Sequence, residues 1–401
     1  MITLKDIEKA KNRLQDVIQH TPLAFAPVLS KELDANIYLK KENLQITGSF
    51  KIRGAFNKIS TLTYEEKACG VVAASAGNHA QGVAYSANYY NIEATIVMPE
   101  ATPLTKVSGV RSHGANVILH GTSYDDAYEF ALNYAKENNK TFVHPYACDS
   151  VIAGQGTLAL EILEQISDID IIIIPIGGGG LITGMATVIK ELKPTIKIVG
   201  VVANGANAMK QSFDLNSIQT VSKVKTIADG IAVKNVMPKM YDYVKDVVDE
   251  IVEVSDNEIA NAILTLMEKQ KIIVEGAGAT SLAAILHNKI DYKGKNIVLA
   301  LSGGNIDVSM LSLIIEKGLV KSARKMNLII TLIDKPGALK KLTNIFEEVD
   351  ANIVQIDYDR DSVTLDFGEA NITIALETKG EAHQEELKEK LTQNGYIFKQ
   401  I

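Results

Sequence analysis

Short runs rich in valine and isoleucine, most of them continuously apolar, recur along the chain, and segments of helical length separate them. Strands that are buried on both faces of a parallel sheet have this pattern, whereas half-buried strands alternate apolar and polar residues. We therefore expect an α/β fold with mostly parallel sheets and flanking helices, and more than one sheet, because eight strands with their helices exceed a single core. The runs lie at residues 37–41, 70–74, 94–98, 116–120, 170–176, 196–202, 251–254 and 296–301.

The pattern changes after residue 318. A short basic segment, LVKSARKM at 319–326, comes first. The remainder predicts strand 328–333, helix 336–349, strands 352–358 and 370–378, helix 384–394 and strand 396–401. This βαββαβ order is that of a ferredoxin-like unit. We place a domain boundary near 320–326, which agrees with a chain of 401 residues being too long for one core.

Composition excludes several classes of protein. Lys and Arg number 41 against 48 Asp and Glu, a net charge of −7, so no basic surface for nucleic acid is expected. The two cysteines, Cys69 and Cys148, cannot form a disulfide framework, and this favours a reducing cytoplasm. The first residues are charged and lack the apolar core of a signal peptide, and no apolar run is long enough to span a bilayer.

The segment DIIIIPIGGGGLITG, at 170–184, joins a buried strand to a helix through Gly177, Gly178, Gly179 and Gly180. Backbone amides at such a junction, together with the positive end of the helix, can surround a phosphate. A tight turn is the alternative, although a turn needs only one or two glycines. Neither the nucleotide P-loop nor the dinucleotide fingerprint fits the spacing, so we expect the phosphate of a compact cofactor.

A second segment, ENLQITGSFKIRGA at 42–55, contains Lys51 at a predicted junction of loop and helix. We expect Ser49 to cap the helix and Arg53 to help lower the pKa of Lys51, which would make its amine a nucleophile. A solvated surface lysine is the alternative.

Two further segments follow predicted strands. In SAGNHAQG, at 75–82, backbone amides and the Asn78 side chain could bind a carboxylate or an oxyanion. His79 is either a general base or, more often for a histidine near a helix start, a structural residue. SGGNID, at 302–307, alone could be a simple glycine turn.

These four segments, in this order, resemble the fold-type II pyridoxal 5′-phosphate enzymes and, among them, the threonine and serine dehydratases. The resemblance covers roughly residues 5–318. It implies that Lys51 binds the cofactor covalently, that Phe50 packs near its ring, that Asn78 bonds its 3′ oxygen and that Ser302 faces its pyridine nitrogen. The residues implied to hold the phosphate are Gly177, Gly178, Gly179, Gly180 and Leu181. Those implied to receive the substrate carboxylate are Ser75, Ala76, Gly77 and His79.

The implied activity is dehydration and deamination of L-threonine to 2-oxobutanoate and ammonia, with L-serine giving pyruvate. Related serine racemases carry a second serine where this chain has Ala76, which favours dehydration here. Their divalent-cation segment resembles residues 200–209, which contain no Asp or Glu, so no metal site is expected. Glu275 could lie near the cofactor or simply begin a helix. A serine dehydratase or racemase, or a non-catalytic amino-acid sensor, remains as an alternative.

The resemblance also divides the chain. It implies a large cofactor-binding domain from 1–52 and 151–320, and a small domain at 53–150. Residues 327–401 resemble an ACT module, which senses amino acids, and isoleucine or valine is the first effector to consider. Pairing of subunits through the sheet edge of this module is the alternative, and family habit implies a homo-oligomer, a tetramer or dimer. The implied effector residues lie in the turn DKPGAL: Asp334, Pro336, Gly337, Ala338 and Leu339.

Overall fold

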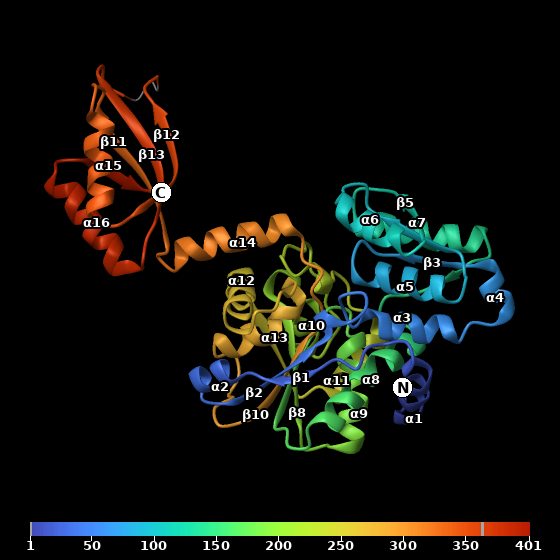
Figure 1. Ribbon diagram of the computed structural model, residues 1–401. Helices are drawn as coiled ribbons and strands as arrows, with labels where there is room; N and C mark the ends of the chain where they lie inside the picture. Colours follow the sequence, from blue (N-terminus) through green and yellow to red (C-terminus); the bar gives the residue numbers. More distant parts are fainter. Residues whose placement is uncertain (1, 362–364) are drawn as a thin grey trace. The chain divides into compact units, whose positions relative to one another are not determined.

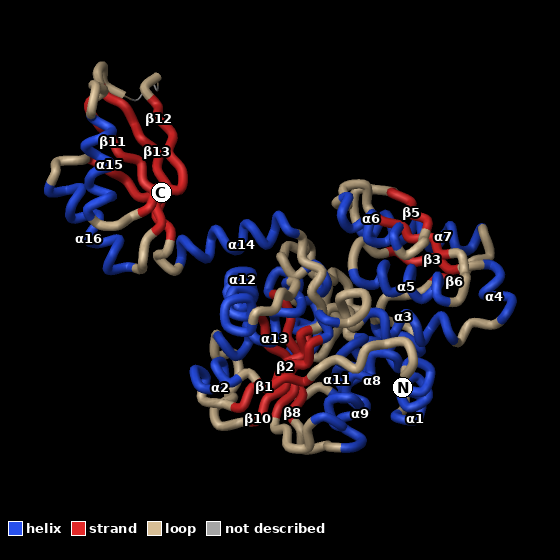
Figure 2. The backbone as a smooth tube through the Cα atoms, viewed as in Figure 1, coloured by secondary structure: helices blue, strands red, loops and turns tan. Residues whose placement is uncertain are grey.

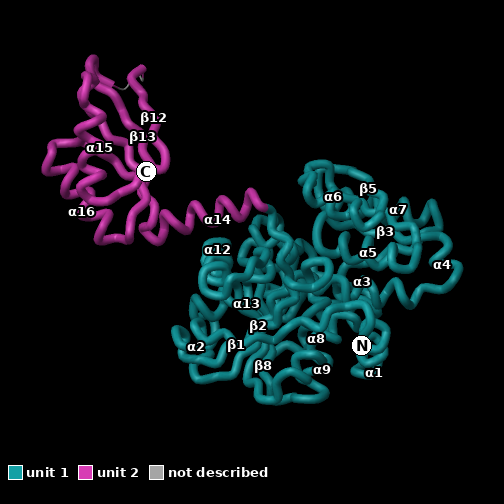
Figure 3. Tube along the Cα trace, viewed as in Figure 1, with its two compact units in different colours: residues 1–307 teal, residues 308–401 magenta. Residues whose placement is uncertain are grey.

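The computed structural model describes residues 2–361 and 365–401 and divides the chain into two compact units. The first is Met1–Asp307 and the second is Val308–Ile401 (Figure 3). Helix α14, Val308–Lys321, groups with the second unit, so the division lies N-terminal to the boundary expected at 320–326.

The larger sheet of the first unit has six strands in the order β1-β2-β10-β7-β8-β9. Only β1 is antiparallel to its neighbour; the other pairs are parallel. The strands are β1 (Leu23–Phe25), β2 (Asn36–Lys41), β7 (Ile171–Pro175), β8 (Lys197–Ala203), β9 (Glu250–Val254) and β10 (Asn296–Leu301).

Helices cover both faces of this sheet (Figures 1 and 2). Ile172 and Ile174 of β7 share a core with α8 and α9, while α13 packs against β7, β8, β9 and β10. The helices are α1 (Leu4–Leu14), α2 (Pro27–Leu33), α8 (Asp149–Gln165), α9 (Gly180–Leu192), α10 (Ala208–Asp214), α11 (Pro238–Val247), α12 (Asp256–Thr265) and α13 (Gly276–Leu286). Single-turn helices occur at Glu42–Leu44, Asn204–Ala206, Asp229–Ile231 and Leu266–Gln270.

The smaller sheet has four parallel strands in the order β5-β4-β3-β6. Val71 and Ala73 of β3 pack in one core with α3, α5 and α6, and Val72 and Ala74 pack with α7 in another. Burial on both faces explains the continuous apolar run. The strands are β3 (Val71–Ala74), β4 (Ala94–Met98), β5 (Asn116–Leu119) and β6 (Thr141–Phe142). The helices are α3 (Lys51–Ser60), α4 (Tyr64–Cys69), α5 (Asn78–Tyr89), α6 (Leu104–Ser112) and α7 (Tyr124–Glu137).

The predicted α/β class with more than one parallel sheet is confirmed, and each of the eight predicted strands is present. The prediction missed β1 and β6, which have only three and two residues. Runs this short carry no usable periodicity.

Within the second unit, α14 is followed by the order β11-α15-β12-β13-α16-β14, which is the predicted βαββαβ unit. Its sheet is antiparallel with the order β12-β13-β11-β14. Alternate residues of β11, such as Leu328 and Ile330, pack with Leu342 and Phe346 of α15 and Leu387 of α16. The elements of this unit are β11 (Lys325–Ile333), α15 (Ala338–Glu348), β12 (Asn352–Asp359), β13 (Glu369–Glu377), α16 (Glu381–Gln393) and β14 (Ile397–Gln400).

Nowhere in the described part of the chain is a helix both long and apolar enough to cross a bilayer.

Candidate active site

A pocket in the first unit lies where strands of both sheets end and the following loops begin. Ligands bind at this edge in open α/β sheets, because the carboxyl ends of parallel strands meet helix N-termini there. The glycine loop follows β7, Ser302 follows β10, and Asn78 begins the helix after β3. The predicted cofactor residues that line the pocket are Phe50, Lys51, Asn78, Gly177, Gly178, Gly179, Gly180, Leu181 and Ser302.

Lys51 is the first residue of α3, and its side chain lies inside this pocket. Its Nζ is 3.3 Å from the carbonyl oxygen of Pro145 and 5.2 Å from the centre of the Phe50 ring. Burial lowers the pKa of the Lys51 amine from 10.5 to about 8, although the Glu275 carboxylate partly offsets this effect. About a tenth of the Lys51 amine is therefore uncharged and nucleophilic at pH 7, far more than for an ordinary lysine.

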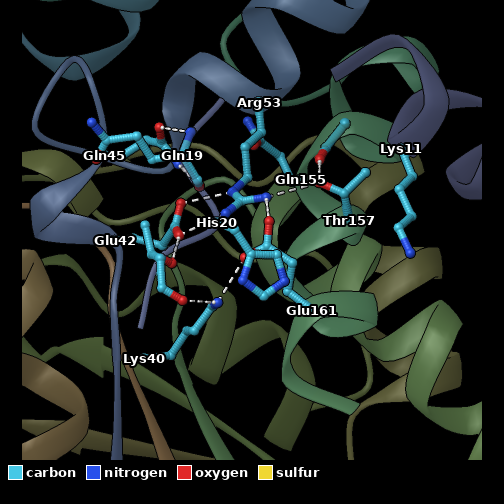
Figure 4. A network of polar contacts seen from close by, with 12 residues as sticks. Lys11, Gln19, His20, Lys40, Glu42, Gln45, Arg53, Gln155, Thr157 and Glu161 are labelled. Atoms are coloured by element: carbon cyan, nitrogen blue, oxygen red, sulfur yellow. Dashed lines mark hydrogen bonds and ion pairs between the residues drawn. The ribbon is translucent and has the colours of Figure 1, made fainter. Parts of the chain in front are cut away.

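The expectation that Arg53 lowers the pKa of Lys51 is wrong. The guanidinium of Arg53 is fully buried and binds two carboxylates, as Figure 4 shows. Nε and Nη2 donate to Glu42 at 2.7 and 2.8 Å, and Nη1 donates to Glu161 at 2.6 Å. Because these partners compensate its charge, the low pKa of Lys51 results from burial.

Lys40 completes this buried charge network, which consists of Lys40, Glu42, Arg53 and Glu161. Its Nζ donates to Glu161 at 2.7 Å, and both side chains are almost inaccessible to solvent (Figure 4). Burial lowers the pKa of Lys40 despite the nearby Glu161 carboxylate. Burial alone would raise the pKa of Glu161, but Arg53 and Lys40 outweigh it and hold that pKa below its usual value. The network joins β2, the single-turn helix Glu42–Leu44, α3 and α8.

Ser49 is not the predicted helix cap. The residue before α3 is Phe50, which has helical dihedral angles and provides no side-chain cap. Ser49 instead pairs through its backbone with Gly303, and the N–H of Phe50 donates to the carbonyl of Ser302 at 3.0 Å. These contacts attach the lysine loop, the segment from Gln45 to Phe50 that leads to Lys51, to the loop after β10.

The four glycines form a cradle that no other residue would fit. A Cβ at Gly178 would lie 2.4 Å from the ring of Tyr146, and one at Gly177 would lie 2.9 Å from Cα of Ile231. Gly179 has a φ of 91°, which side-chain-bearing residues rarely adopt. The first N–H groups of α9 have no acceptor within the helix. A glycine backbone at a helix start, open to the pocket, fits a phosphate group.

The four residues predicted to receive the substrate carboxylate do not line the pocket. Within the segment Ser75–His79, Asn78 is the one residue of the lining. A Cβ at Gly77 would meet no atom within 4 Å, and the N–H of Gly77 donates to the Ser75 hydroxyl at 3.2 Å. His79 is buried, with Nε2 2.9 Å from the carbonyl of Val143. Burial and the charge of Lys51 lower the pKa of His79 to about 3. A neutral ring held by a backbone carbonyl favours the structural role of His79.

Glu275 lies in the pocket wall at the start of α13. The Asn78 amide donates to its two carboxylate oxygens at 2.7 and 2.9 Å. Burial, together with the charge of Asp229, raises the pKa of Glu275 to about 7, while the Asn78 bond opposes the shift. The sequence left two alternatives for Glu275, a place near the cofactor or a place at a helix start. In the structure Glu275 precedes the first residue of α13 and also lines the pocket.

Tyr146 and Gln155 also line the pocket, and the sequence prediction missed them. Gln155 accepts the N–H of Gly54 at 3.1 Å, while its buried Nε2 has no hydrogen-bond partner. The sequence did contain a signal for a close contact at this position, because Gln155 lies between two glycines inside a helix. A Cβ at Gly154 would lie 2.4 Å from the carbonyl of Arg53, so the glycine marks a close approach of two helices.

A lysine with a lowered pKa and a glycine cradle line one pocket at the strand ends. This is the site expected of an enzyme that binds a phosphorylated cofactor through an amine of the protein. The family model described as pyridoxal-phosphate dependent enzyme matches residues 14–303. The chain belongs to this family, and its cofactor is pyridoxal 5′-phosphate.

Similar proteins agree with this membership. An L-threonine ammonia-lyase of Thermotoga maritima is 48% identical over 396 residues, which are 99% of this chain and 98% of that protein. The structure of threonine deaminase isoform 2 from Solanum lycopersicum has a TM-score of 0.74 and 39% identity, and the match covers 78% of this chain and 86% of that chain. Maize serine racemase has a TM-score of 0.75 and 34% identity, over 80% of this chain and 98% of that chain.

The low pKa of Lys51 predicts selective labelling. In the cofactor-free protein, acetylation of Lys51 by trace acetic anhydride should rise with pH through a midpoint near 8, because only the uncharged amine reacts. At pH 8 its free-amine fraction should exceed that of an ordinary lysine about a hundredfold. Mass spectrometry of the digested protein measures this, with Lys58 of the same helix as control. A midpoint for Lys51 above about 10, the ordinary range for lysine, would contradict the buried amine.

Proposed function

We propose that the protein is an L-threonine ammonia-lyase that converts L-threonine to 2-oxobutanoate and ammonia, and L-serine to pyruvate and ammonia. The observation that carries the proposal is that the Lys51 amine, with its lowered pKa, and the glycine cradle line one pocket. The name of the Thermotoga maritima relative, which matches almost the whole chain, supports the choice of substrate.

Each part of the pocket has a proposed binding role. Amides of Gly177–Gly180 and Leu181 hold the phosphate, and Phe50 packs beside the ring. Asn78 donates to the 3′ oxygen, and the Ser302 hydroxyl faces the pyridine nitrogen. The loop from Ser75 to Gly77 and the start of α5 receive the substrate carboxylate, because helix N-termini favour anions.

Pyridoxal phosphate, when bound, supplies an electron sink that acidifies the α-carbon of the substrate. Lys51 accepts the α-proton, which it can do near neutral pH because burial keeps part of the amine uncharged. The β-hydroxyl then leaves as water, and hydrolysis of the resulting enamine product returns one water and releases ammonia. A serine hydroxyl at Ser302 does not favour a protonated pyridine nitrogen as a carboxylate would, and this favours elimination over transamination.

A serine dehydratase or racemase is the second candidate, since maize serine racemase shares the fold at 34% identity. Ala76 argues against racemisation, because it offers no hydroxyl to act as a second acid or base. Initial rates with L-threonine, L-serine and D-serine, with chiral analysis of residual serine, distinguish the candidates. The proposal expects L-threonine to be the best substrate and D-serine not to form from L-serine. Abundant D-serine would overturn the inference that Ala76 prevents racemisation.

A non-catalytic amino-acid sensor would keep the fold without turnover. Borohydride treatment of the cofactor-loaded protein separates this candidate, because reduction should fix the mass of the cofactor on the peptide that contains Lys51. Cofactor fixed on Lys51 without any turnover would favour the sensor, and its absence from Lys51 would remove the enzyme proposal.

We further propose that the βαββαβ unit binds an amino-acid effector, isoleucine or valine, at the turn before α15. Gly337 precedes this helix with a φ of 85°. The N–H of Ala338 donates to the carbonyl of Lys335 at 3.1 Å, so the N–H groups from Leu339 onward are the ones proposed to bind a carboxylate. Asp334, Pro336 and Gly337 belong to the same turn, and Asp334 is the acidic group proposed to bind the ammonium of the effector. The Tyr358 hydroxyl donates to the Asp334 carboxylate at 2.8 Å, and Arg360 pairs with this carboxylate at 2.6 Å. Pairing of subunits through the sheet edge remains the alternative role.

A matched pair of substitutions tests this effector site. Gly337→Asp should abolish any effect of isoleucine or valine on the threonine saturation curve, because the new carboxylate repels that of the effector. Gly337→Asn should keep the effect, since it has the same shape without the charge and no atom lies within 4 Å of the added Cβ. Both variants adopt a positive φ at a cost of about 1 kcal/mol. Unchanged kinetics in every protein, with or without effector, would favour the structural role of the unit.

The division into a large domain (1–52 and 151–320) and a small one (53–150) remains part of the proposal. The two separate, mostly parallel sheets support it, although α14 groups with the second unit, so the large domain would end at residue 307. We also propose a cytoplasmic homo-oligomer, a tetramer or dimer, with a small-molecule substrate and no nucleic-acid or membrane partner. Sedimentation of the full-length protein tests the oligomeric state.

A further inference from the structure

Asn305 follows Ser302 by three residues and is outside the pocket lining, yet its side chain contacts two segments that form the pocket. Its Nδ2 donates to the carbonyl oxygen of Thr47 at 2.9 Å and to Oδ1 of Asn78 at 2.6 Å. Thr47 lies in the loop that leads to Lys51, and Asn78 begins α5. One partly buried amide therefore connects three segments that are far apart in sequence.

The direction of these hydrogen bonds follows from a group that can accept a hydrogen bond but cannot donate one. The carbonyl of Thr47 can only accept, so the nitrogen of the Asn305 amide must face it. The second hydrogen of this nitrogen then requires an acceptor, which is Oδ1 of Asn78. The nitrogen of Asn78 is thereby directed to its opposite side, where Glu275 accepts at 2.7 and 2.9 Å.

Packing restricts Asn305 as well. Gly48 has a φ of 71°, and a Cβ there would lie 2.5 Å from Oδ1 of Asn305. The N–H of Gly304 donates to the carbonyl of Gly48 at 2.8 Å, so the backbone beside Asn305 is also attached to the lysine loop. The side chain has little freedom to rotate away from Asn78.

We propose that Asn305 is a positioning residue that fixes the orientation of the Asn78 amide, so that its N–H donor, and not its oxygen, is presented to the pocket. This inference rests on the proposed function, in which Asn78 donates to the 3′ oxygen of the cofactor. Asn305 acts through Asn78 and touches neither cofactor nor substrate. A rotated Asn78 amide would present an acceptor to that oxygen and to the Glu275 carboxylate.

Asn305→Asp provides the sharpest test, because it keeps the shape and replaces the donor by a carboxylate. It should lower kcat for threonine about 10²-fold, the scale expected when a contact to the reacting group is misplaced. It should also weaken cofactor affinity and shift the absorbance of the bound cofactor, which reports ionisation of the 3′ oxygen without turnover. Asn305→Ala should give smaller changes in the same direction.

Asn43→Ala is the matched control. Asn43 is likewise a partly buried asparagine beside this loop, and its Nδ2 donates to a backbone carbonyl, that of Ile273, at 3.0 Å. It does not contact Asn78, so its removal should leave the cofactor absorbance and kcat near those of the wild type. Equal changes of kcat and absorbance in the Asn43 and Asn305 variants would overturn the proposal.

The double variant Asn78→Ala/Asn305→Asp tests whether Asn305 acts through Asn78. The proposal expects its cofactor affinity, absorbance and kcat to equal those of Asn78→Ala alone, whereas independent roles would make the losses multiply. Multiplied losses would therefore contradict it. If the wild type binds the cofactor but does not convert threonine, the proposed function fails, while affinity and absorbance still decide the role of Asn305.

Discussion

Lys51→Ala should reduce threonine turnover by about 10⁴-fold, the upper range for loss of a positioned general base. The substitution removes both the amine that holds the cofactor and the group proposed to accept the α-proton. Lys51→Arg should be nearly as inactive, because a guanidinium stays protonated and cannot act as a nucleophile. Initial rates of 2-oxobutanoate formation measure both effects.

The control for this prediction is Lys58→Ala in the same helix, which lies outside the pocket lining and should keep its activity. A small amine such as methylamine should restore part of the turnover of Lys51→Ala, because it can supply a base in the space left by the side chain. Substantial activity of Lys51→Ala without added amine would show that another residue performs the proton transfer.

Arg53→Met should destabilise the protein by about 3–5 kcal/mol, because Glu42 and Glu161 would remain buried without their shared counter-charge. The side chain of Arg53 is fully buried, and three of its nitrogens donate to these two carboxylates. Urea unfolding of the full-length protein measures the loss. The double variant Glu42→Gln/Arg53→Met should recover part of it, since one unpaired carboxylate is removed.

A surface ion pair provides the comparison for Arg53. Lys11 pairs with Glu164, and both side chains are close to half exposed, so Lys11→Met should change stability by less than about 1 kcal/mol. The pKa of Glu161 is lowered in the fold, so its contribution to stability is present at neutral pH and is lost as the pH falls below its ordinary value of 4.5. The difference between wild type and Arg53→Met should therefore shrink in acid. Equal losses for the Lys11 and Arg53 variants would contradict a stabilising buried network.

Much of the fold was predictable, because burial on both faces of a parallel strand leaves a continuous apolar run such as Val71–Ala74. The resemblance to the family implied that Lys51 and the glycine loop belong to one site, and both line the same pocket. Strands as short as β1 and β6 were not predictable, and neither were the ion pairs of Arg53 with Glu42 and Glu161. Glu161, its second carboxylate, is 108 residues away in the chain.

The failed predictions share a cause. The Ser49 cap and the influence of Arg53 on Lys51 were inferred from neighbours in sequence, but Ser49 pairs with Gly303 and Arg53 with distant carboxylates. Asn305 and Asn78 are 227 residues apart, so no local pattern shows that one orients the other. Local sequence predicted part of the pocket lining, such as Lys51 and the glycines, but tertiary contacts add Tyr146 and Gln155 and decide how each group is held.

The central claim is that this pocket dehydrates L-threonine through Lys51, and that hydrolysis of the dehydration product gives 2-oxobutanoate and ammonia. The most direct measurement is the yield of 2-oxobutanoate and of ammonia from L-threonine with the cofactor-loaded full-length protein, beside Lys51→Ala. The account predicts equal molar amounts of the two products from the wild type and almost none from the variant. No 2-oxobutanoate from wild-type protein whose cofactor is bound to Lys51, or equal yields from the two proteins, would contradict it.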